Sequence, residues 1–224
     1  MRLVEAMVEA NHRALAGDSR AGLRPADFAN SLPIAALTCI DPRMHPLMPE
    51  VLGVAEEDFI WVTSAGNRIA HLGCDTLLTL SMACAVHRAR EILVIGHTDC
   101  PFCNLRPPQL LQHLQALGID LAQAAGKLND FLSQFTDEQH NVQRAVQLAR
   151  SSVLIAPTIP IHGLLVDIHS GRLDWIVNGY QSKGAPAVES TAKTEPAAPP
   201  AARTDGRLGG GYKIGGDLPP IGSG

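Results

Sequence analysis

Two short clusters of residues have the types and spacing that metal chemistry requires. The first is CIDPR at positions 39–43, and the second is GHTDC at positions 96–100. Together they offer two thiols and one imidazole, from Cys39, Cys100 and His97. This ligand set suits zinc, and three protein ligands leave a fourth position for water. The sequence therefore predicts a zinc site made by these three side chains.

Asp41 and Arg43 are predicted to work beside that metal. Residues two apart in an extended chain point the same way, so both side chains converge with Cys39 on one side. Zinc lowers the pKa of bound water and creates a hydroxide nucleophile near neutral pH. A carboxylate orients that hydroxide, and an arginine keeps the carboxylate ionised in a charge-assisted pair. We therefore predict catalytic roles for Asp41 and Arg43.

Each of these residue types also has an ordinary structural use. Cys39 alone would be a small buried apolar side chain, and Asp41 with Arg43 would be an ion pair at a turn. Asp99 is expected to shape a turn or cap a helix. Cys103 reads as an incidental thiol, with a redox role as the alternative. The joint occurrence of the two clusters favours the metal site.

The elements that position these residues are strands. The two clusters follow apolar runs typical of buried strands, at 33–39 and 91–95. Further strands are expected at 59–63, 161–168 and 173–177, and helices at 1–16, 75–90, 107–117, 121–135 and 138–151. Strands separated by helices predict an α/β fold with a mostly parallel sheet flanked by helices. Such sheets place ligands at the carboxyl ends of their strands.

Composition bounds the function and the organisation of the chain. The 224 residues carry a formal charge of -4, without the basic stripe of a nucleic-acid binder. No apolar run suits a membrane helix, and Glu5 and Glu9 interrupt any signal-like segment, so we expect a cytoplasmic protein. Five cysteines, an odd number, do not suggest a disulfide framework.

Two regions are expected along the chain. Residues 1–180 form the zinc domain, and residues 181–224 form a tail rich in Pro, Ala and Gly that is predicted to be disordered. The alternative for the tail is a linker that ends in a short docking peptide for a protein partner. Its apolar anchors would be Tyr212, Ile214, Leu218 and Ile221.

The order of CIDPR, SAGN at 64–67 and GHTDC resembles the β-class carbonic anhydrases over residues 30–178. The form of the second cluster is most similar to the small bacterial branch that also includes carbonyl sulfide hydrolase. The resemblance implies zinc on Cys39, His97 and Cys100, a dyad of Asp41 and Arg43, and a homodimer or a multiple of it. Ser64, Gly66 and Asn67 are candidates for the substrate pocket, and Gly66 and Asn67 are expected to shape a backbone turn near the metal.

The expected activity is reversible hydration of CO2 to bicarbonate and a proton by zinc-bound hydroxide. One alternative is hydrolysis of carbonyl sulfide or carbon disulfide at the same site. It is motivated by Pro101, which stands where the family usually has glycine, and by the extra thiol of Cys103. A second alternative is a noncatalytic zinc-binding scaffold that recruits partners through the tail.

Overall fold

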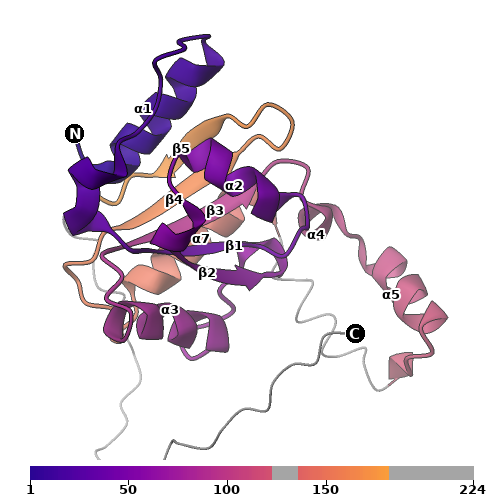
Figure 1. Ribbon diagram of the computed structural model, residues 1–224. Coiled ribbons are helices and arrows are strands. Elements are labelled where there is room, and N and C mark those ends of the chain that lie inside the picture. Colours follow the sequence, from indigo (N-terminus) through magenta and orange to yellow (C-terminus); the bar gives the residue numbers. More distant parts are fainter. Residues whose placement is uncertain (123–135, 182–224) are drawn as a thin grey trace, which may run out of the picture. The chain divides into compact units, whose positions relative to one another are not determined.

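The computed structural model describes residues 1–122 and 136–181. Its frame is a five-stranded sheet with the order β2-β1-β3-β4-β5 (Figure 1). The strands are β1 Ile34–Cys39, β2 Phe59–Ser64, β3 Glu91–His97, β4 Ile161–Val166 and β5 Leu173–Val177. β1 pairs in parallel with β2 and β3, β3 pairs in parallel with β4, and β5 is antiparallel to β4. The predicted α/β fold with a mostly parallel sheet is therefore confirmed.

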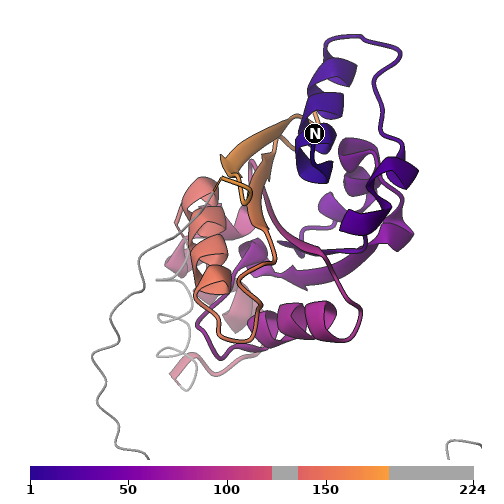
Figure 2. The ribbon, with the colours of Figure 1, turned by 90° about the vertical axis from the view of Figure 1, so that its left-hand side faces the viewer.

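Helices cover both faces of this sheet. The helices of the described residues are α1 Leu3–Leu15, α2 Met44–Leu52, α3 Asp75–Ala85, α4 Pro101–Asn104, α5 Pro107–Ala116 and α7 Glu138–Arg150, with short 3₁₀ turns at Pro25–Ser31, Glu56–Asp58 and Ala65–Asn67. α1 and α2 lie on one face, and α3 and α7 lie on the other (Figure 2). The central strands are thus buried on both sides, which explains their near-continuous apolar sequence.

Successive side chains of β3 point to opposite faces of the sheet, so the core has two halves. Leu93 and Ile95 pack with α1 and α2, whereas Ile92 and Val94 pack with α3 and α7. α7 packs closely against the sheet because a glycine of β4 faces it. A Cβ on Gly163 would lie 2.6 Å from a methyl group of α7. This close approach sets α7 beside the end of β3, where the second cluster begins.

One helix prediction needs correction, and one helix was missed. The helix expected over 75–90 ends at Ala85, and Arg88 has a φ of 59°, which a continuing helix does not allow. α2 Met44–Leu52 was not among the predicted helices; Pro46 lies in its first turn and Pro49 lies further inside.

The remaining predictions concern segments beyond the described part of the chain. The helix expected over 121–135 falls almost wholly outside the described residues, and so does the tail from 182 onward. The division into a domain over 1–180 and a tail over 181–224 stays a prediction. Among the helices of the described residues, none has the length and apolar character needed to cross a membrane.

Candidate metal centre

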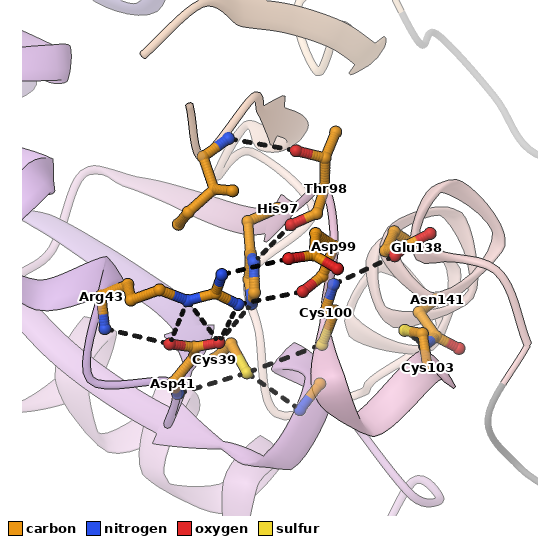
Figure 3. Close-up of polar contacts among 12 residues, drawn as sticks. Cys39, Asp41, Arg43, His97, Thr98, Asp99, Cys100, Cys103, Glu138 and Asn141 are labelled. Carbon is orange, nitrogen blue, oxygen red and sulfur yellow. Dashed lines mark hydrogen bonds and ion pairs between the residues drawn. The ribbon is translucent and has the colours of Figure 1, made fainter. Parts of the chain in front are cut away.

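The sheet brings the two clusters together at one edge. β1 and β3 are parallel neighbours, so their carboxyl ends meet there, and Cys39 and His97 are their last residues. Cys100 follows a tight turn and caps α4. The chain goes from β1 to β2 on one side and then crosses to β3 on the other side of β1, so the strand order reverses at this point. Figure 3 shows the side chains of Cys39, His97 and Cys100 gathered there. Open α/β sheets bind their ligands at such a point.

The three predicted ligands converge. One donor atom each from Cys39, His97 and Cys100 lies within 4.8 Å of the others, and all three residues are buried. The two sulfur atoms are 4.0 Å apart. Zinc held tetrahedrally at about 2.3 Å from each sulfur would require a separation of about 3.8 Å. The donor set thus fits a tetrahedral metal ion with little adjustment.

The imidazole of His97 is oriented for such a role. Its Nδ1 lies 2.9 Å from the backbone oxygen of Thr98, which fixes the ring. Its Nε2 is buried and has no hydrogen-bond partner among the described residues. A buried ring nitrogen without a partner is costly in a protein interior. A metal ion at this place would satisfy it, with the other nitrogen held as in most histidine–metal sites.

Both thiols are protonated in the metal-free chain. The hydrogen bond with Cys100, together with burial, raises the pKa of Cys39 to about 12. The pKa of Cys100 is raised to about 11, first by its interaction with Cys103 and also by burial, against an opposing contribution from Cys39. The backbone N–H groups of Asp41 and Gly66 each point at Cys39 Sγ from 3.4 Å. A divalent cation would displace the thiol protons, and these two donors would then stabilise the thiolate.

Asp41 and Arg43 form the ion pair that the sequence predicted. Arg43 Nη2 donates to Asp41 Oδ2 at 2.7 Å, and Nε donates to Oδ1 at 3.0 Å. This two-point contact holds the pKa of Asp41 down at about 2. Asp41 Oδ2 lies 3.8 Å from Nε2 of His97, so an ionised carboxylate stands beside the free ring nitrogen.

Asp99 also binds Arg43, a contact that the sequence analysis missed. Arg43 Nη1 donates to Asp99 Oδ2 at 3.2 Å, and Nη2 donates to the Asp99 backbone oxygen at 2.9 Å. Asp99 has a φ of 52°, so it does form the tight turn that was expected. Its position next to Cys100 was the available signal, because a carboxylate there had to face the same edge as Arg43.

α7 supplies two further contacts that the sequence analysis did not find. Glu138 Oε1 accepts the backbone N–H of Cys100 at 3.2 Å, and Asn141 Nδ2 donates to Cys103 Sγ at 3.2 Å. Residues three apart share one face of a helix, so both reach the same turn. Nothing local in the sequence connects residue 138 with residue 100.

The residues of the segment 64–67 differ in how they contact the metal centre. Gly66 has a φ of 65°, which lets its backbone N–H reach Cys39. Asn67 is 3% exposed and adjoins Gly96 through its side-chain oxygen. The hydroxyl of Ser64 instead donates to the backbone oxygen of Arg68 at 3.0 Å. A place for all three in a substrate pocket stays a prediction.

Comparison with known proteins shows which family this arrangement belongs to. A family model described as carbonic anhydrase matches residues 34–173, which is more than half of the chain. The solved β-carbonic anhydrase isoform I from Trichomonas vaginalis is 26% identical and superposes with a TM-score of 0.63, covering 80% of this chain and 100% of that one. The chain belongs to the β-carbonic anhydrase family. The resemblance that was read from the three motifs is thus confirmed.

Two other relatives show the breadth of this β-carbonic anhydrase family. The carbonic anhydrase of Streptococcus mutans is 27% identical, with a TM-score of 0.55 and coverage of 79% of this chain and 99% of that chain. The carbon disulfide hydrolase of Acidithiobacillus thiooxidans is 22% identical over 164 residues, which are 67% of this chain and 80% of the relative.

Proposed function

We propose that this protein catalyses the reversible hydration of CO2 to bicarbonate and a proton, with zinc held by Cys39, His97 and Cys100. The convergence of these three buried donors, with Nε2 of His97 left without a partner, is the observation that supports it. When bound, zinc would lower the pKa of a water molecule far enough to make it a nucleophile near neutral pH. The remaining work falls to residues of the chain.

Asp41 is proposed to orient that nucleophile. With a pKa of about 2 its carboxylate is ionised at any working pH, so it accepts a hydrogen bond and does not serve as a proton donor. Arg43 holds both carboxylate oxygens and prevents rotation. Asp99 holds Arg43 from its other side. A fixed acceptor costs no reorganisation when the nucleophile forms its bond to carbon.

Stopped-flow CO2 hydration by zinc-loaded full-length protein tests this function. Wild type should bind one zinc per chain, and Cys39→Ser should lose zinc and more than about 100-fold of the rate. Cys84→Ser is the matched control, because it makes the same change in a partly buried cysteine. Cys84 lies on α3, away from the metal cluster. Equal rates in Cys39→Ser and wild type would refute the site. Stoichiometric zinc without hydration would favour the noncatalytic scaffold.

A second candidate is hydrolysis of carbon disulfide or carbonyl sulfide at the same site. The similarity to a carbon disulfide hydrolase favours it. So does Pro101, which removes a backbone N–H directly beside the ligand Cys100. Turnover of CO2 and of both sulfur compounds by one preparation separates the candidates, because the preferred substrate shows the higher kcat/KM.

The proposed assembly is a homodimer or a multiple of it, as the resemblance implied. Light scattering on the purified zinc-loaded protein measures this directly, and a monomer at working concentration would contradict it. A cytoplasmic location stays a prediction.

A further inference from the structure

A third sulfur lies next to the proposed ligands and has no part in the proposed reaction. Cys103 follows Cys100 in the sequence CPFC at 100–103. The backbone N–H of Cys103 donates to the Cys100 oxygen at 3.1 Å, which closes a tight turn. This turn places Cys100 at the N-cap of α4 and Cys103 within the same short helix. Figure 3 shows Cys103 on the α7 side of Cys100, away from Cys39.

Cys103 differs from the ligand thiols in its surroundings. Cys39 and Cys100 are 2% and 1% exposed, whereas Cys103 is only partly buried. Its sulfur accepts a hydrogen bond from Asn141, whose side chain is itself buried. Cys103 is therefore the thiol of this group that a small solute reaches first, and the Asn141 amide on α7 fixes the position of its sulfur.

We propose that Cys100 and Cys103 form a disulfide in the presence of hydrogen peroxide, and that this reversible bond releases the metal ion. The identity of the metal as zinc rests on the proposed function, but the pairing of the two sulfurs does not. A sulfur bound in a disulfide carries no thiolate charge and is lost as a ligand. Two protein ligands then remain in a site built for three.

The chemistry proceeds in two balanced steps. Peroxide first oxidises the Cys103 thiol to a sulfenic acid: its O–O bond breaks, an S–O bond forms and one water leaves. The Cys100 sulfur then attacks the Cys103 sulfur, so that the S–S bond forms and the S–O bond breaks. The departing hydroxide takes a proton from the solvent and becomes the second water. In sum, the Cys100 thiolate, the Cys103 thiol, one peroxide and one solvent proton give one disulfide and two waters.

Geometry favours Cys103 over Cys39 as the partner of Cys100. A disulfide requires Cα atoms about 4.4–6.8 Å apart, and the ends of a hydrogen-bonded turn lie within about 7 Å. Cys39 Sγ is also near, at 4.0 Å from Cys100 Sγ. However, Cys39 ends a strand that is hydrogen-bonded on both sides, and two backbone N–H groups point at its sulfur. The short α4 segment has fewer restraints against the shift that bond formation needs.

The test follows zinc and disulfides in the full-length zinc-loaded protein. Hydrogen peroxide is added, released zinc is measured with a coloured chelator, and blocked digests are mapped by mass spectrometry. Wild type and Cys84→Ser should release zinc together with a Cys100–Cys103 disulfide, and dithiothreitol with added zinc should restore the metal. Cys103→Ser should keep its initial zinc content and release it at least about tenfold more slowly.

Two results would overturn the proposal: release from Cys103→Ser at the wild-type rate, or a wild-type disulfide that joins Cys39 to Cys100. If Cys103→Ser does not fold, as judged by circular dichroism, the wild-type map alone decides the pairing. A purified chain that binds no zinc would contradict the proposed function, and the same map would then still confirm or refute the disulfide.

Discussion

Two buried histidines lie on neighbouring strands at opposite ends. One lies where the parallel strands end, here called the carboxyl edge, and the other lies where they begin, here called the amino edge. His97 ends β3 at the carboxyl edge, and His162 lies near the start of β4 at the amino edge. Both side chains are fully buried, and each faces a carboxylate: Asp41 at 3.8 Å from His97 and Glu91 at 3.2 Å from His162. By residue type and burial alone, the two places are nearly equivalent.

Their surroundings separate them. His162 Nδ1 accepts the backbone N–H of Gly179 at 3.0 Å, and its ring packs edge-on against Tyr180 at 4.3 Å. Glu91 in turn accepts the Tyr180 hydroxyl at 2.5 Å. His162 Nε2, like His97 Nε2, has no hydrogen-bond partner among the described residues. The other neighbours of His162 are a backbone N–H, an aromatic ring and a carboxylate that is bonded to a hydroxyl, and none of them is a thiol. His97 instead turns Nε2 toward two sulfur atoms. A buried His–carboxylate pair therefore indicates a metal site only where the remaining neighbours are further ligands.

The contrast between the two histidines is tested by making the same substitution at each of them. His97→Gln should abolish zinc binding and lower CO2 hydration by about 1,000-fold or more, since it removes a ligand. His162→Gln should keep zinc and rate but lower the free energy of unfolding by about 2–3 kcal/mol, because the backbone N–H of Gly179 loses its acceptor and the ring packing against Tyr180 is lost. Zinc analysis, stopped-flow assays and urea unfolding measure these effects.

The unfolding experiments need a chelator in every sample, because bound metal stabilises the folded state by mass action. Under that condition His97→Gln should unfold within about 1 kcal/mol of the metal-free wild type. Zinc loss in His162→Gln, or zinc retention in His97→Gln, would remove the distinction between the two edges.

The same contrast explains what the sequence predicted. The carboxyl-edge ligands follow apolar runs directly, so two local patterns and the rule for strand ends sufficed to bring them together. The contacts around them join distant positions: Arg43 with Asp99 across 56 residues, and Cys100 with Glu138 across 38. No periodicity encodes such pairs, because they depend on how α7 and the turn after β3 pack.

The amino edge was not predicted at all. Glu91 read as the first residue of a strand and His162 as a residue within one. The bond between Glu91 and Tyr180 spans 89 positions, and it forms only after the chain has passed through β4 and β5. The end of α3 was also predicted too late, because the helix ends at Ala85 and Arg88 has a φ of 59°.

Asp99→Asn tests how Asp99 supports Arg43 at the carboxyl edge, and its expected effect on activity is smaller. Asparagine keeps the backbone contact to Arg43 but removes the charge that faces Nη1. We expect kcat/KM for CO2 hydration to fall about threefold to tenfold with unchanged zinc content, since Arg43 then holds Asp41 less firmly. Arg43→Lys should cost more, because lysine cannot make the two-point contact with Asp41. A wild-type rate in Asp99→Asn would leave that residue only its role in the turn.

Tyr180→Phe tests the amino edge with the smallest expected effect, and pH distinguishes it from a general loss of packing. Burial, and then the hydrogen bond to Glu91, raise the pKa of Tyr180 above its usual value of 10.0. Above that pH the unfolded chain loses a proton that the folded chain keeps, so stability falls as pH rises beyond about 10. Below about pH 10 the full contribution of the hydroxyl, about 1 kcal/mol, is present.

The stability difference between wild type and Tyr180→Phe should therefore be constant from about pH 7 to pH 9 and shrink above about pH 10. Urea unfolding with chelator at each pH measures it, and the comparison of two chains cancels the titration of the cysteines. A difference that stays constant through pH 10 would mean that the hydroxyl is no more buried than in the unfolded chain. The amino edge would then be held by ring packing, and the contrast with His97 would rest on the Gly179 contact alone.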